Sequence, residues 1–256
     1  MSSLGRGSLF GLLLCAGVLA QPVVVAPCGV SNVTVSGAPS ADYFEQADEL
    51  LGAARPAGVN AWLPYGMALT NRASQNIVAV AVRWLVTNEK GQTSSFSVTS
   101  MMFDQPRQQV PPGKSVIAVP GALLGASPMP RQFPLTHLVE FQNAQKVQVT
   151  LDGVVFASGQ FAGPNNGKVY EEFVAETTIP ARVAATLLAM REVGERISTV
   201  VAWLETNSKP QSNDRHAQIT ARTAKAFLSD YKRGGEALLY QTAEGYEKAP
   251  GIRLYR

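Results

Sequence analysis

The run from residue 76 to residue 88, NIVAVAVRWLVTN, constrains the fold of this chain more than any other stretch. Apolar residues occupy every second position of it, which is the period of a β-strand with one face on a core. We expect one set to face the core and the other, which contains Arg83, to face outward. The expected inward set is Val78, Val80, Val82, Trp84 and Val86, and the expected outward set is Ile77, Ala79, Ala81, Arg83 and Leu85.

Other short runs rich in Val, Ile, Thr and aromatic residues lie on either side of it: AWLPYGMALTN, QTSSFSVTSMMF, KSVIAVPG and KVQVTLDGVVFASG. Turn residues such as Asn88-Glu89-Lys90-Gly91 and Pro111-Pro112-Gly113 separate these runs. Short strands with turns between them predict an antiparallel β-sandwich. We place it at residues 59–163, after a partly irregular segment at 21–58 and before a helical region at 164–256. The predicted fold class is α+β.

The strand and turn around Trp84, VAVRWLVTNEKG, resemble the immunoglobulin and fibronectin type III pattern. The resemblance covers residues 59–161 and lacks the two flanking cysteines of antibody domains. The whole layout is similar to uncharacterised exported bacterial proteins that carry such a sandwich and a helical C-terminal region. This resemblance implies an immunoglobulin-like fold, and it supplies no catalytic residues.

The N-terminal run LFGLLLCAGVLA at residues 9–20 has the length of a signal-peptide core. We predict a signal peptide at residues 1–20, cleavage after Ala20, and a secreted or periplasmic protein; an uncleaved anchor is the alternative. Leu14 before Cys15 and Pro27 before Cys28 do not favour a lipoprotein. Cys28 then stands alone, so no internal disulfide is expected. We expect no membrane-spanning segment after the signal.

Charge density separates the two parts of the chain. Residues 21–165 carry eight Lys/Arg and eight Asp/Glu, whereas the shorter stretch 166–256 carries thirteen and eleven. A net charge of +2 in the second part does not make a nucleic-acid-binding arm. The change in density marks a boundary near Gly163-Pro164.

The second part has helical periodicity. Apolar residues at the a and d positions of about three heptads predict a helical seam from Val183 to Leu204. Pro180 is expected to interrupt or restart the helix just before this seam. A second helix is expected at residues 214–232, with Ile219, Ala226 and Phe227 toward its partner, and it ends before Gly234-Gly235. A short third piece contains Leu238, Leu239 and Tyr246. The chain is expected to be a monomer in which the seam packs internally; a dimer through the seam is the alternative. The seam residues are Val183, Leu187, Met190, Gly194, Ile197, Val201 and Leu204.

The segment LDGVVFASGQFAGPNNG joins the two parts. We interpret it as the last strand of the sheet, followed by turns and a helix cap supplied by Asn165 or Asn166. The alternative is that Asp152, Asn165 and Asn166 bind a cation such as calcium, although one carboxylate is poor provision for that ion.

The search for catalytic residues finds little. His137 lies near Glu140, His216 lies near Asp214, and the Glu171-Glu172 pair is explained by a helix start. No HExxH, GxSxG, P-loop or GxGxxG motif is present. We therefore predict no catalytic, cofactor-binding or metal-binding residue and no cofactor. A pocket that joins His137 or His216 to two acids would favour an enzyme.

These observations predict an exported, non-catalytic binding or scaffold module whose partner is a protein or glycan of the cell envelope. Two alternatives remain. One is a periplasmic chaperone-like protein that binds a client strand, with Arg83 and Lys146 as basic anchors. The other is a carbohydrate-active enzyme with paired carboxylates.

Overall fold

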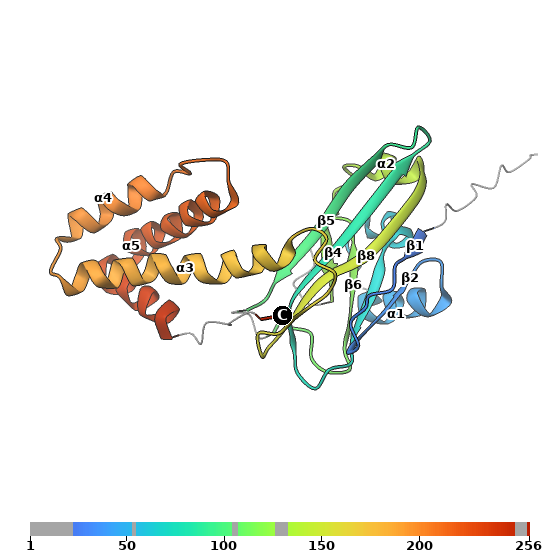
Figure 1. The fold of residues 1–256 in the computed structure, drawn as a ribbon, viewed down its shortest axis with the longest axis horizontal. Coiled ribbons are helices and arrows are strands. Elements are labelled where there is room, and N and C mark those ends of the chain that lie inside the picture. The colour runs from blue at the N-terminus through green and yellow to red at the C-terminus, as the bar shows by residue number, and fades with distance from the viewer. Residues whose placement is uncertain (1–22, 53–54, 104–106, 126–132, 249–254) are drawn as a thin grey trace, which may run out of the picture.

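The computed structural model describes residues 23–52, 55–103, 107–125, 133–248 and 255–256. The expected signal peptide at 1–20 lies outside this part of the chain. Two β-sheets pack together, and a helical lobe extends from one side of them (Figure 1). The combination of sheets and C-terminal helices confirms the α+β class.

Sheet A has the strand order β1-β8-β4-β5, with β9 paired to β8, and sheet B has the order β2-β3-β6-β7. All pairs are antiparallel except β1 with β8, which run parallel. Within the predicted sandwich at residues 59–163 the strand pairs are antiparallel, as expected, and the parallel strand β1 comes from the segment 21–58, which was expected to be partly irregular. Antiparallel neighbours are commonly joined by short hairpins, whereas residues 26–143 lie between β1 and β8, so no hairpin fixes the relative direction of these two strands. The strands are β1 (Val23–Val25), β2 (Val33–Gly37), β3 (Met67–Asn71), β4 (Ile77–Asn88), β5 (Thr93–Met101), β6 (Ser115–Val119), β7 (Ala122–Leu124), β8 (Ala144–Phe156) and β9 (Phe161–Ala162).

The core between the sheets contains Val80, Val82, Trp84 and Val86, as the alternation predicted. Trp84 is fully buried, and its indole Nε1 donates a hydrogen bond of 2.7 Å to the carbonyl oxygen of Tyr65. Trp84 is therefore a core residue and not part of an exposed platform.

The outer face of β4 differs from the expectation. Ala79 and Ala81 are buried, because Phe173 and the start of helix α3 (Val169–Glu192) cover them. The register of β4 against β8 shifts between Ile77 and Ala79. This irregularity changes the side on which the next residues lie, so Ile77 packs in the inner core and Val78 packs in the outer cluster.

The N-terminal segment contributes ordered elements to the same core. Helix α1 (Ala41–Leu51) is capped by Ser40, whose hydroxyl accepts from the Tyr43 N–H. The Tyr43 hydroxyl donates to the Leu63 carbonyl at 2.8 Å, and burial raises the pKa of this hydroxyl above its usual range.

The run AWLPYGMALTN forms a strand only in its second half. Its first half contains the 3-10 helix η3 (Leu63–Tyr65), where Pro64 has no N–H to donate to a sheet, and another 3-10 helix, η2 (Val59–Ala61), ends at the first residue of the run. The remaining helix of this part is α2 (Leu138–Gln142).

The helical lobe consists of α3, α4 (Ile197–Asn207) and α5 (Arg215–Lys248). The predicted seam is not one continuous helix, since α3 ends at Glu192 and Gly194 takes a φ of 74° in the turn before α4. The prediction that Pro180 interrupts a helix was also wrong, because α3 continues through it. Leu187 and Leu204 are fully buried in a core made by the three helices.

Helix α5 begins as predicted, because the Asp214 side chain caps it by accepting from the Ala217 N–H at 2.9 Å. Its backbone leaves helical geometry at Gly235, where the sequence predicted an end. Phe227 is buried, but Ala226 is exposed, which corrects the expected interior face.

Within the described residues, α3 is long and apolar enough by length and composition to cross a membrane. This corrects the expectation that no later stretch has these properties. Buried core helices pass the same test, and eight residues of α3 are buried inside the protein.

Candidate functional site

The two parts of the protein meet at Asp152 on β8. Its side chain is buried, and its two carboxylate oxygens accept hydrogen bonds of 2.7 Å from the backbone N–H groups of Asn166 and Gly167. A carboxylate held in this way faces positive ends of backbone dipoles, which are repulsive to a cation. The geometry favours a structural role for Asp152 over the cation site considered above.

The N-cap residue of α3 is Lys168, which makes no side-chain capping hydrogen bond, but the Asn165 side chain, and not that of Asn166, accepts from a backbone N–H in the first turn. Its Oδ1 accepts from the Tyr170 N–H at 2.7 Å, and its Nδ2 donates to Glu171 Oε2 at 3.0 Å. The Asn165 hydrogen bond is the main reason that the pKa of Glu171 is lowered. A side chain at Gly167 would lie 2.6 Å from Asp152 Oδ2, so this position requires a glycine for the close approach.

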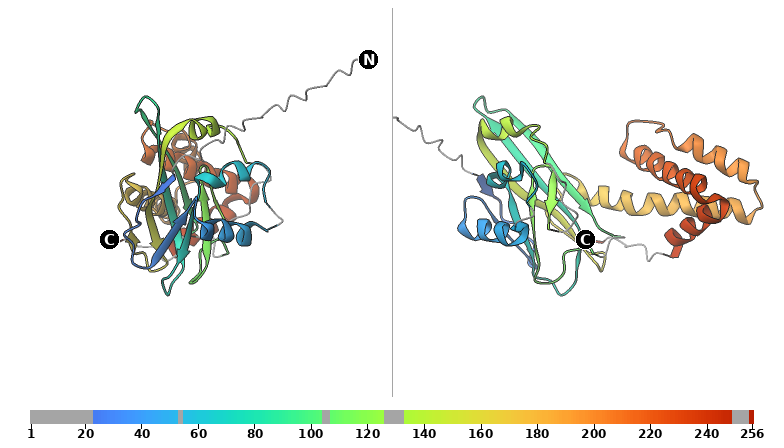
Figure 2. Two further views of the ribbon diagram at one scale, coloured as in Figure 1. Left: turned by 90° about the vertical axis from the view of Figure 1, so that its right-hand side faces the viewer. Right: turned by 180° about the vertical axis from the view of Figure 1, so that it is seen from behind.

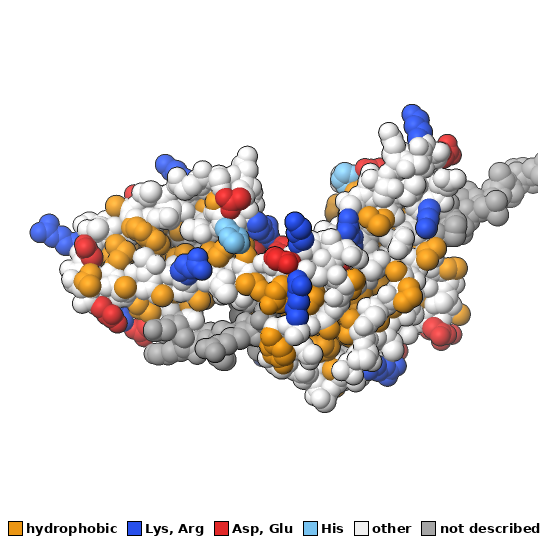
Figure 3. All heavy atoms as spheres, viewed as in Figure 1, with side chains coloured by type: hydrophobic (Ala, Val, Ile, Leu, Met, Phe, Trp, Pro, Cys, Tyr) orange, Lys and Arg blue, Asp and Glu red, His pale blue; other side chains and the backbone are white. Residues whose placement is uncertain are grey.

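A cleft lies between the outer face of sheet A and the helical lobe. It consists of one hollow of about 270 Å³ and a second of about 360 Å³, and both are lined by Gly167 and Glu172. Charged side chains gather where the two lobes meet (Figure 3). We call this region the interlobe cleft; its polar lining consists of Arg83, Ser95, Ser97, Thr99, Asp152, Lys168, Glu171, Glu172, Arg215 and His216.

Arginine–glutamate pairs hold the helical side of the interlobe cleft together. Arg215 contacts Glu172 at 2.7 Å and Glu176 at 3.0 Å, so it links α5 to α3. Arg222 forms a further pair with Glu176, whose side chain is only 7% exposed. Because Glu176 is nearly buried and has two cationic partners, this cluster fixes the wall of the cleft.

His216 lines the same hollow as Glu171 and Glu172. This is the combination of a histidine and two acids that the sequence analysis set as favourable to an enzyme. Both acids have arginine partners, however: Glu171 contacts Arg256 at 3.1 Å and Glu172 contacts Arg215.

His137 lies elsewhere, beside α2. Its Nδ1 is 2.5 Å from Glu140 Oε1, and both side chains are about half exposed. Its ring contacts Phe96 with a centroid separation of 5.5 Å. The structure therefore does not bring His137 into the interlobe cleft.

Arg83 and Lys146, the two basic anchors considered for a client strand, share the outer face of sheet A but are not adjacent. Arg83 is opposite Thr150, and Lys146 is opposite Thr87, which is four residues from Arg83. This separation is about 13 Å along the strands. Arg83 instead donates through Nε to the Ser95 hydroxyl at 2.9 Å.

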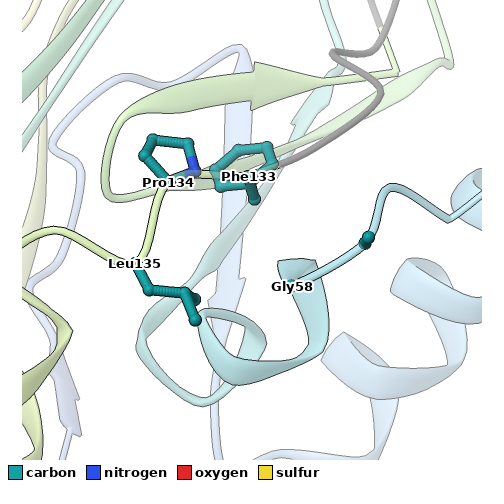
Figure 4. A pocket seen from close by; sticks show the side chains of 5 residues that line it. Gly58, Phe133, Pro134 and Leu135 are labelled. Carbon is teal, nitrogen blue, oxygen red and sulfur yellow. The ribbon is translucent and has the colours of Figure 1, made fainter.

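A further hollow, of about 580 Å³, lies beside Gly58 and the segment from Phe133 to Leu135 (Figure 4). Its labelled side chains are Phe133, Pro134 and Leu135, with no charged or hydroxyl group among the residues that line it. Binding sites usually place a few polar groups in a largely apolar hollow, so the interlobe cleft is the stronger candidate.

The sequence analysis did not single out Ser95, Ser97 and Thr99, although their spacing was visible in QTSSFSVTSMMF. Hydroxyl residues there alternate with Phe96 and Val98, so a period of two already separated a polar face from an apolar one. Arg215 gave no such signal, because its partners lie 39 and 43 residues away.

Across the described residues, no group of three or more His, Cys, Asp or Glu side chains is arranged to hold a metal ion. Comparison of the whole chain with known proteins found no matching family, no matching curated protein and no matching solved structure.

Proposed function

We propose that this protein is an exported, non-catalytic binding module of the cell envelope that holds a protein or glycan partner in the interlobe cleft. The observation that carries the proposal is the polar face of β4 and β5 beside the start of α3. The Ser95, Ser97 and Thr99 side chains and the Arg83 guanidinium line one hollow there. Hydroxyl and guanidinium groups on rigid strands suit recognition, because a hydroxyl both donates and accepts hydrogen bonds and a guanidinium presents N–H donors in a fixed planar geometry.

A binding role fits this lining better than catalysis does. Asp152 is engaged by backbone N–H groups, and Glu172 is paired with Arg215. A general acid or base needs a proton-transfer group directed at the substrate. Engaged carboxylates serve instead to hold the two walls of the cleft in place.

We also propose that the sandwich is immunoglobulin-like. The buried Trp84 on a central strand supports this, as does packing of sheets A and B around one core. The parallel pairing of β1 and the presence of α1 between β2 and β3 depart from a simple antiparallel arrangement.

Export can be tested by itself. The mature protein is expected to begin at Gln21, two residues before β1, and to appear in the periplasm or medium. N-terminal sequencing of the fractionated protein checks this. Recovery of the full-length chain in the cytoplasm would contradict it.

Binding is tested with the chain from Gln21 onward, which keeps every described residue. We expect the wild type to retain an envelope protein or purified glycan on a column, and Arg83→Glu to retain at least about tenfold less, because the change reverses the charge in the cleft. Lys90→Glu, in the exposed turn between β4 and β5, makes the same charge change away from the cleft and is the matched control. Equal retention by the two variants would refute a site in the cleft.

One observation favours a second candidate, a carbohydrate-active enzyme: His216, Glu171 and Glu172 line one hollow. This function predicts hydrolysis of an envelope glycan that is lost in Glu172→Gln and kept in Glu205→Gln, an exposed position on α4. Absence of released sugar from a panel of envelope glycans would leave the binding module as the better account.

A further inference from the structure

Strand β5 is a long edge strand without the usual protection. It pairs only with β4 among the described strands, and its nine residues contain neither proline nor a charged residue. The other terminal strands, β1, β7 and β2, have three, three and five residues. Natural edge strands are usually short, charged, proline-containing or bulged, because these features prevent pairing with another chain.

The edge is also regular and accessible. The register of β5 against β4 runs from Ala79–Met101 to Thr87–Thr93 without a shift, whereas β4 against β8 has three shifts. Thr93, Ser94, Ser95 and Ser97 are exposed. Beyond β4 no described strand pairs with β5, although β7 of sheet B lies close to it, so the outer backbone N–H and C=O groups of β5 can form a template for another strand.

We propose that the outer edge of β5 binds an extended polypeptide segment by strand addition, so that the segment becomes a further strand of sheet A. The inference rests on the proposed function and names the partner class as a polypeptide. Main-chain hydrogen bonds to β5 supply the affinity, and side chains on the two faces of the sheet supply the selectivity.

The side chains of β5 indicate what the segment contains. Ser95, Ser97 and Thr99 line the interlobe cleft, while Phe96 and Val98 pack against the core between the sheets. Favourable cross-strand pairs join hydroxyl residues to each other and aromatic to β-branched residues. The segment that fits is uncharged, with Ser or Thr alternating with Val, Ile or an aromatic residue.

The position of the edge favours a single segment over a second copy of this protein. Strand β5 lies on the side of the sandwich nearest the helical lobe (Figure 1), and the view from behind shows the same arrangement (Figure 2). An added strand widens a sheet by only about 5 Å. A second copy would bring its own two-sheet sandwich and helices to the side where this lobe already lies.

The test uses a fluorescent synthetic peptide with the sequence of β5 itself, TSSFSVTSM, flanked by lysines for solubility. In antiparallel pairing this peptide places Ser opposite Ser97, and Val and Phe opposite Phe96 and Val98. We expect saturable binding to the chain from Gln21 onward, measured by fluorescence anisotropy. A peptide N-methylated at alternate residues keeps the side chains but loses half of its N–H donors, and it is expected to bind at least about tenfold more weakly.

Hydrogen exchange measured by mass spectrometry locates the bound peptide in the wild type. Amides of β5 are expected to become protected on binding. Ser97→Lys places a charge on the edge and is expected to weaken binding at least about tenfold. Gln148→Lys adds the same charge to the same face on interior strand β8 and is the matched control. Ser97→Glu is a second variant with a charge on the edge strand. Its glutamate would lie opposite Arg83, so the two side chains attract each other across β4 and β5.

Several results would overturn the inference. Each of three results would do so: no binding up to roughly 1 mM peptide, equal binding of the N-methylated peptide, or protection of amides away from β5. The proposed function would not fall with it, because loss of partner retention in the Arg83→Glu variant is measured separately. A wild-type dimer in light scattering that Ser97→Lys dissociates would show that a second copy occupies the edge instead.

Discussion

Replacing Asp152 by alanine tests how the two lobes are joined. The substitution removes two hydrogen bonds of 2.7 Å from the Asn166 and Gly167 N–H groups to a charged acceptor. Hydrogen bonds to charged groups contribute about 1.5–3 kcal/mol each to the free energy of unfolding. Because Asn166 and Gly167 are exposed, water can replace part of the interaction. We therefore expect Asp152→Ala to lower the free energy of unfolding by about 3 kcal/mol, which is the lower end of the range for two such hydrogen bonds.

The assay is urea unfolding followed by tryptophan fluorescence. Trp62 and Trp84 report on the sandwich and Trp203 on α4, so a Trp203→Phe background isolates the sandwich signal. We expect Asp152→Asn to lose less stability than Asp152→Ala, because its amide keeps one acceptor oxygen. The control is Glu89→Ala at an exposed turn, with a change within about 0.5 kcal/mol.

Two results would refute this reasoning about Asp152. One is a loss below about 1 kcal/mol in Asp152→Ala, which is less than a single hydrogen bond to a charged group contributes. The other is a rise in the melting temperature of the wild type with calcium that disappears in Asp152→Asn. That rise would show that the carboxylate binds a cation, in spite of the two N–H groups directed at it.

Three further predictions concern the core, the helical lobe and a helix cap. Trp84→Ala should lower the free energy of unfolding by about 3–5 kcal/mol, because it leaves a cavity and an unpaired Tyr65 carbonyl; a urea melt that changes by less than about 1 kcal/mol would contradict this. Leu187→Asp should unfold the lobe, because it places a charge in the lobe core; circular dichroism should show a loss of helix, and a fully helical variant would disprove the packing argument. The pKa of Asp214 is lowered, chiefly by the Ser212 hydroxyl and then by the Ala217 N–H. The contribution of the Asp214 carboxylate to stability should therefore be complete above the ordinary aspartate pKa of about 4, and it should be lost as the pH falls through the lowered pKa of the folded protein. An NMR titration that gives Asp214 an ordinary pKa would contradict its role as a helix cap.

Local sequence patterns determined much of the fold. The period of two in β4 identified Trp84 as a core residue, because alternate side chains of a strand point to opposite faces. Asp214 and Gly235 marked a helix start and an interruption, because capping and a positive φ depend on single residues. The signal peptide and the immunoglobulin-like character remain predictions.

The tertiary structure alone decided what covers each face and what lines the candidate site. Ala79 and Ala81 are buried because α3 begins about 90 residues later and returns across them. The parallel pairing of β1 and the place of β5 at the end of sheet A likewise depend on where distant strands lie. Arg215 reaches the interlobe cleft through partners on another helix. Periodicity reports which side of an element is apolar, whereas its neighbours are set by the packing of the whole chain.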